Sequence, residues 1–175
     1  MKNLEEPSQR PDIYLNDSIV NIAKNHMLTD GFVASVFITI KDNKFAAYPV
    51  PPNEMDDKDE LARKLKNLVD TQQPDFYYFI NEVFFYKAKA QDPKGIDEFV
   101  KEYVGPDGKL LVPDKDKAEA IHIMAVRVEP DKSKSRWSAI IEFHRDGNGK
   151  VSHFSPENWV KDKEQDISIK GRFTI

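Results

Sequence analysis

The sequence predicts a single α+β domain with a mostly antiparallel sheet of about five to seven strands, two or more hairpins, and two main helices packed on one face of the sheet. Three observations predict this class: short segments in which apolar residues alternate, turn-forming residues between those segments, and two longer segments with apolar residues at helical spacing. At 175 residues the chain fits one hydrophobic core. We expect a flexible N-terminal arm at 1–13 and the domain itself at 14–175.

Two segments have the apolar spacing of an amphipathic helix. The first spans about 16–29, where Asn16 or Asp17 is placed to cap the first turn and Gly31 follows as a left-handed stop. The second spans about 56–73, opens with acidic residues that suit a helix N-terminus, and ends where a proline follows.

The first predicted hairpin joins an apolar, β-branched run at 33–40 to a second strand at 45–50. Asp42 and Asn43 lie between the two runs, and both residue types tolerate a positive φ. The sequence therefore predicts a tight turn at this point.

The second predicted hairpin joins strands at 119–129 and 136–145. Its alternating apolar residues must share one face, so residues with odd numbers must pair with residues with odd numbers. A register that satisfies this condition places His122 opposite His144. This register predicts a histidine pair that the linear sequence does not reveal.

The segment 76–87 contains seven aromatic residues and is interpreted as the central strand, although a helix would also place several of them on one side. Both of its faces are apolar, so one face is expected to meet the helices. The other face would then meet a second layer, a covering loop or a partner subunit, which makes a homodimer possible.

The remaining predicted elements are short. A helix is expected at 96–104, a strand at 150–154, and a last edge strand over the alternating apolar residues of 167–175.

Composition excludes several classes of function. The net charge of −4 and the pI near 5.6 give no broad positive field, so nucleic acid is an unlikely partner. The one basic run, at Lys132, Lys134 and Arg136, is interpreted as a solvated turn rather than a phosphate site. The absence of cysteine excludes disulfides and thiolate chemistry and favours a reducing, cytoplasmic location. No segment has the apolar length of a membrane span or a signal peptide.

No motif that carries chemistry is present. Glycine-rich phosphate loops, the H-E-x-x-H zinc motif and the G-x-S-x-G nucleophile motif are all missing from the sequence. The stretch 146–150 resembles the start of a calcium loop, but Lys150 stands at the fifth position and Val151 replaces the glycine required at the sixth. We interpret this stretch as a hairpin turn.

One group of residues suggests a metal site. Glu82 and Glu119 are candidate catalytic carboxylates, and His122 and His144 are candidate metal ligands, because imidazole nitrogens and carboxylate oxygens both suit Zn²⁺ or Mn²⁺. The competing interpretation is structural: Glu82 would accept a hydrogen bond from a neighbour such as Arg145, and the histidines would be solvated.

A non-catalytic module that binds a ligand or a protein through an aromatic-lined sheet face is the preferred functional hypothesis. The alternative is a metal-assisted hydrolase that uses the Glu/His group, and a third possibility is acid–base chemistry by a Glu82 kept protonated in apolar surroundings. No cofactor is identified, and the sequence leaves open whether the protein is an enzyme. The candidate binding residues are Tyr78, Asn81, Glu82, Phe84, Tyr86 and Arg145.

Overall fold

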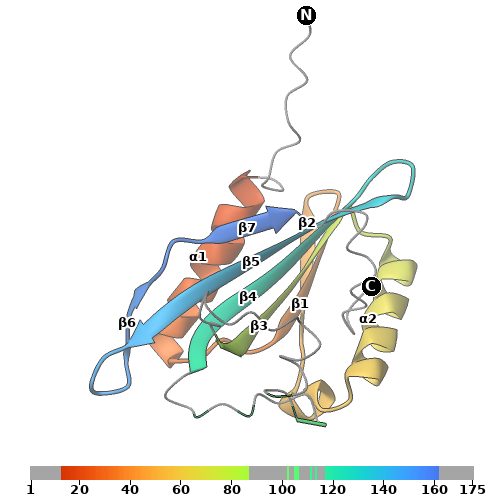
Figure 1. The fold of residues 1–175 in the computed structure, drawn as a ribbon. Helices are drawn as coiled ribbons and strands as arrows, with labels where there is room; N and C mark the ends of the chain where they lie inside the picture. Colours follow the sequence, from red (N-terminus) through yellow and green to blue (C-terminus); the bar gives the residue numbers. More distant parts are fainter. Residues whose placement is uncertain are drawn as a thin grey trace, which may run out of the picture.

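An antiparallel sheet of seven strands, with a helix on each face, is formed by the part of the chain that the computed structural model describes (Figure 1). The described residues are 13–86, 102, 105–106, 111, 113 and 117–161. The elements in chain order are α1 (Ile13–Asp30), β1 (Val36–Lys41), β2 (Lys44–Pro49), a 3₁₀ turn η1 (Pro52–Met55), α2 (Lys58–Gln72), β3 (Phe76–Tyr86), β4 (Lys117–Val128), β5 (Lys134–Arg145), β6 (Val151–Phe154) and β7 (Asn158–Lys161).

The sheet has the strand order β2-β1-β3-β4-β5-β6, and β7 also pairs with β5. All of these pairs are antiparallel. The α+β class predicted from the sequence is therefore confirmed. The aromatic segment is the strand β3 rather than a helix, and it lies in the middle of the sheet between β1 and β4.

The first hairpin forms as predicted. β1 and β2 pair up to Lys41 opposite Lys44, and the two residues between them, Asp42 and Asn43, have φ of 49° and 60°. Two consecutive residues with positive φ make the tight hairpin turn whose twist matches that of the strands.

Helix α1 ends as predicted and starts earlier than predicted. Gly31 has a φ of +79°, and its N–H donates to the carbonyl of Met27 at 3.0 Å, which closes the C-terminus. The predicted capping residues, Asn16 and Asp17, are already helical because α1 begins at Ile13.

Helix α2 is closed at both ends. The side chain of Asp57 accepts a hydrogen bond from the N–H of Glu60 at 3.0 Å, and Gln73 takes the left-handed conformation after the last turn. The C-terminal turn is attached to the sheet because the buried hydroxyl of Thr39 donates to the side chain of Gln72 at 2.8 Å.

The prediction that both helices pack on one face is wrong. Because neighbouring residues of a strand point to opposite faces, the sheet supplies two separate apolar surfaces, and each is covered by one helix. The α1 face joins Ile19, Val20, Ala23 and Met27 to Ile38, Tyr78, Ile123 and Trp137, and the α2 face joins Leu61, Leu65 and Val69 to Phe37, Tyr77, Phe79 and Val126.

The register predicted for the second hairpin is also wrong. His122 lies opposite Ile140, so no pair forms between His122 and His144. The predicted parity is kept, but the turn is tighter than expected: the Glu129 N–H donates to the carbonyl of Ser133 at 2.8 Å, and pairing continues up to Lys134. This tight turn shifts the partners along the strands while each side chain stays on its predicted face.

The last described strand, β7, is not predicted from the sequence. It is four residues long, too short for an alternating pattern, and pairs with β5 beside β6. The predicted short helix at 96–104 and the terminal strand at 167–175 lie outside the described residues, apart from Glu102. The predicted arm at 1–13 also lies outside them, apart from Ile13, which begins α1.

Truncation of Met27 to alanine should lower the free energy of unfolding by about 2–5 kcal/mol, because the side chain is 0% exposed between α1 and the sheet. The matched control is Leu28→Ala on the same helix, where the side chain is 56% exposed and the expected loss is below about 0.5 kcal/mol. Urea unfolding of both variants measures the difference. Equal losses would contradict the placement of α1.

Candidate functional site

The four candidate ligands of the predicted metal site lie on opposite faces of the sheet. In the register of β3, β4 and β5, Glu82 and Glu119 share the α1 face, whereas His122 and His144 share the α2 face. The sheet itself separates the carboxylates from the imidazoles, so these four side chains do not form one site. Within the described ranges, no group of three or more His, Asp or Glu side chains is arranged to hold a metal ion.

Glu82 is held against the C-terminal end of α1. Its carboxylate accepts a hydrogen bond from the N–H of Val33 at 3.1 Å. Burial raises the pKa of Glu82 above its ordinary value, and this effect outweighs the lowering caused by the Val33 N–H and by Arg145. Glu82 borders neither of the two hollows described below.

Arg145 joins three parts of the chain. Its Nε donates to the Glu119 carboxylate at 3.0 and 3.2 Å, its Nη2 donates to the carbonyl of Gly31 at 3.1 Å, and its Nη1 donates to the carbonyl of Gly149 at 3.1 Å. A guanidinium at the end of α1 also complements the negative end of the helix dipole. Arg145, together with Glu119, therefore attaches the end of α1 and the β5–β6 turn to the sheet.

The histidines have local partners. His122 Nδ1 lies 3.1 Å from the side-chain oxygen of Asn81 across the β3–β4 pair. The ring of His144 stacks on the ring of His153 with centroids 4.4 Å apart, and its Nε2 lies 3.7 Å from the Glu142 carboxylate. These contacts explain the positions of the histidines without a bound ligand.

The aromatic candidates do not form one surface. Tyr78 is 0% exposed beneath α1, whereas Phe84 is 61% exposed near the end of β3. The side chain of Tyr86 lies outside the described part of the structure. The aromatic residues of β3 mainly fill the two cores, which agrees with the structural role that aromatic strands usually have.

An apolar groove with a volume of about 540 Å³ lies between α1 and the β1–β2 hairpin. We call it the α1 groove. It is lined by Ser18, Ile19, Ile22, Ala23, His26, Val33, Ala34, Ser35, Val36, Ile38, Ile40, Phe45, Ala47, Pro49 and Ile80. The groove lies on the α1 face, where the helix covers the centre of the sheet and leaves the side of β2 open.

Two large apolar side chains at the α1 groove are left in contact with solvent. Phe45 on β2 is 78% exposed and Ile22 on α1 is 50% exposed. The sequence of 45–50 predicts part of this surface. A strand with apolar side chains on both faces is stable when another element covers each face. The sequence alone does not show that only one face of β2 would lie near a helix.

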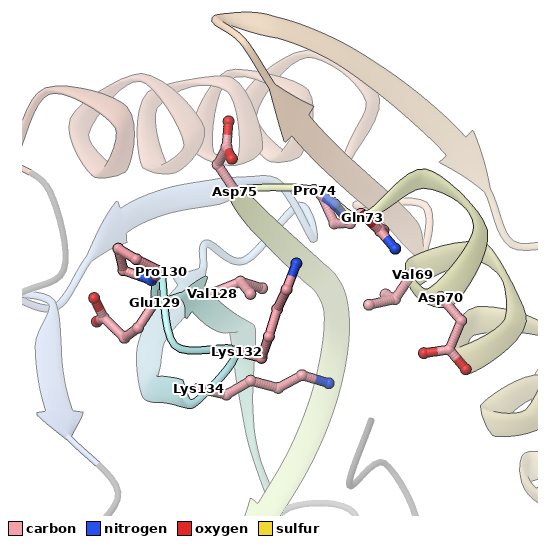
Figure 2. Close-up of a pocket in the computed structure, with 10 residues that line it drawn as sticks. All are labelled: Val69, Asp70, Gln73, Pro74, Asp75, Val128, Glu129, Pro130, Lys132 and Lys134. Carbon is pink, nitrogen blue, oxygen red and sulfur yellow. The ribbon is translucent and has the colours of Figure 1, made fainter.

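A second hollow, which we call the lysine pocket, lies where the C-terminus of α2, the start of β3 and the β4–β5 turn meet (Figure 2). Its volume is about 440 Å³. It is lined by Val69, Asp70, Gln73, Pro74, Asp75, Val128, Glu129, Pro130, Lys132 and Lys134. Lys132 and Lys134, two of the three residues of the basic run interpreted from the sequence as a solvated turn, therefore border a concave site.

Comparisons with protein-family models, with curated proteins and with solved structures found no match for this chain. Neither of the described helices combines the length and the apolar character that crossing a bilayer requires. The function must therefore be argued from the geometry of the two hollows.

Replacing Arg145 by alanine should lower the free energy of unfolding by roughly 1–3 kcal/mol, because the half-buried Glu119 carboxylate and two carbonyls lose their donor. The matched control is Arg63→Ala, which breaks an exposed ion pair with Glu60 on α2 and should leave the free energy of unfolding nearly unchanged. Chemical denaturation measures both. Similar small losses would show that Arg145 does not hold α1 in place.

Replacing Glu82 by glutamine should make the protein more stable at pH 7 and leave its stability unchanged below the ordinary carboxyl pKa of 4.5. A carboxyl with a raised pKa binds more protons in the folded state than in the unfolded state. The wild-type free energy of unfolding therefore falls as the pH rises from 4.5 through the raised pKa, and glutamine removes this loss. Urea unfolding at about pH 4 and pH 7 tests the sign, and a wild-type advantage at pH 7 would contradict it.

Proposed function

We propose that this protein binds a small molecule with an apolar chain in the α1 groove. The observation that carries the proposal is a hollow of about 540 Å³ whose lining is mostly aliphatic. Pockets for small molecules commonly have volumes of roughly 300–1,000 Å³ and apolar walls with a few polar groups. The α1 groove has the size and the chemistry of such a site.

The lining favours a slender, flexible ligand. Ala23, Ala34 and Ala47 are small and leave space between the helix and the hairpin, whereas Ile38 and Ile80 form an apolar floor from the sheet. An aliphatic chain in this space would contact side chains on α1, β1 and β2 at once. Each methylene group removed from water there stabilises the complex by about 0.8 kcal/mol.

Three polar side chains among the lining residues provide contacts for a polar end group. Ser18 and His26 come from α1, and Ser35 precedes β1. The Nδ1 of His26 lies 3.1 Å from the carboxylate of Asp30, which orients the ring. We therefore propose an amphipathic ligand with one acyl-like chain and one polar end, such as a medium-chain fatty acid.

The exposed side chain of Phe45 also supports the proposal. Phe45 on the strand β2 is 78% exposed, so it buries little apolar area in the free protein. A ligand in the α1 groove would cover part of this ring. The sequence-based hypothesis of an aromatic-lined binding face is thus replaced by an aliphatic groove with a single aromatic residue at its border.

Strand β2 favours a second candidate function, which is association with another protein chain. In the described part of the sheet, β2 is an edge strand paired only with β1. An edge strand next to an apolar groove can accept a strand from a partner, including a second copy of this chain. The homodimer that the sequence leaves possible would, on this proposal, use the β2 edge.

The binding proposal can be tested with a dye that fluoresces in apolar surroundings, displaced by decanoate. Ala47→Phe should weaken binding of both by about tenfold or more, because the added ring fills the α1 groove. Ala46→Phe is the matched control, since Ala46 is also exposed on β2 and points to the other face of the sheet. Equal binding by both variants and the wild type would overturn the proposal.

Sedimentation of the same three proteins separates the two candidates. If a second copy occupies the groove, Ala47→Phe should convert a concentration-dependent dimer to a monomer, and decanoate should not bind the dimer. A wild-type monomer that binds decanoate would support the small-molecule function and exclude the dimer at this edge.

A further inference from the structure

The lysine pocket has a rigid wall on the side of the β4–β5 turn. The Lys132 N–H donates to the carbonyl of Glu129 at 2.9 Å, and Lys132 has a φ of 71°, so the turn holds this residue in the left-handed conformation. The carboxylate of Asp131 accepts from the N–H of Ser133 at 2.9 Å and closes the same turn. The two lysines at the pocket thus extend from a turn whose backbone is fixed.

The ammonium groups of Lys132 and Lys134 extend toward the hollow between the turn and the end of α2 (Figure 2). Within the described ranges, neither lysine forms a salt bridge. The Nζ of Lys134 lies 5.7 Å from the centroid of the Tyr77 ring, and the Asp70 carboxylate attracts this ammonium group at longer range. Burial lowers the pKa of Lys134, which shows that its surroundings disfavour an uncompensated charge.

The three carboxylates at the lysine pocket already have other donors. Asp70 accepts from Lys66 at 2.7 Å, and Asp75 accepts from the N–H of Asp42 at 2.9 Å. Glu129 accepts from Arg127 at 2.6 Å, and Figure 2 shows its carboxylate directed away from both lysine ammonium groups. Two of these carboxylates, Asp70 and Glu129, are therefore paired with cations that do not line the pocket, whereas neither pocket lysine forms a salt bridge.

Apart from the side-chain amide of Gln73, the rest of the wall is apolar. Val69 and Val128 face each other across the hollow, and Pro74 and Pro130 have no N–H to offer. A ligand in this pocket would meet two cationic donors on one side and hydrocarbon on the other.

We propose that the lysine pocket binds a small molecule that carries a phosphate or carboxylate group attached to an apolar group. Lys132 and Lys134 donate to the oxyanion, and the valines and prolines contact the apolar part. This site is separate from the α1 groove: the two share no lining residue. It does not depend on the function proposed for that groove.

The experiment is a titration of isotope-labelled protein with inorganic phosphate, phenyl phosphate and benzoate, followed by the backbone amide signals in NMR at constant ionic strength. Saturable shifts are expected at the β4–β5 turn and the end of α2. Phenyl phosphate and benzoate report whether the apolar wall contributes, and their comparison distinguishes phosphate from carboxylate as the preferred group.

The variant for this test is Lys132→Gly combined with Lys134→Gln. Glycine adopts the positive φ of position 132 without strain, so the turn is kept while both positive charges are removed. The dissociation constant of the best probe should rise by about tenfold or more, because charge-assisted hydrogen bonds are lost. Lys150→Gln, in the exposed turn before β6, is the control and should bind as the wild type does.

The proposal is overturned if none of the three probes produces saturable shifts at the pocket, or if the double variant binds them as tightly as the wild type. Shifts spread equally over exposed lysines would also overturn it, since they indicate non-specific attraction. The Ala47→Phe variant should bind the probes normally, so failure of the groove function and failure of this site are distinguishable.

Discussion

The burial of β3 on both faces is the constraint on which the rest of the structure depends. Tyr77 and Phe79 point into the core beneath α2, while Tyr78 and Ile80 point into the core beneath α1. A strand of this kind cannot lie at an edge, so it requires a neighbour on each side and a helix above and below. The position of β1, β4 and both helices follows from this requirement.

Much of the fold follows from local patterns. Asp42 and Asn43 predict the first turn, Gly31 predicts the end of α1, and the aromatic run predicts β3. The face that each helix covers could not be predicted in the same way, because an apolar stripe on a helix shows that it packs and not against which side. With both faces of β3 equally apolar, the choice between them depends on the length and path of the connections.

The candidate site could be predicted less well from the sequence than the fold could. The sequence predicts that odd-numbered residues of β4 pair with odd-numbered residues of β5. The pairing of His122 with Ile140, however, depends on how tightly residues 129–133 turn. That turn needs a left-handed residue at Lys132, a position that glycine or asparagine would have signalled and lysine does not. Pockets are more difficult to predict from a sequence than strand pairs, because their walls come from residues that are distant in the chain and their volume depends on side chains that do not contact one another. The apolar residues on both faces of the segment 45–50 give a partial signal for the α1 groove.

The contact between Arg145 and Gly31 has a consequence for how the protein folds. It joins positions separated by 114 residues, whereas β3 to β6 pair with their neighbours along the chain. Closing so large a loop costs more entropy than forming successive strand pairs, so we infer that α1 docks on a sheet that has already formed. The α1 groove is then completed by the last step of folding. In a partly opened protein, it would be the first feature to disappear, before the sheet itself loses its order.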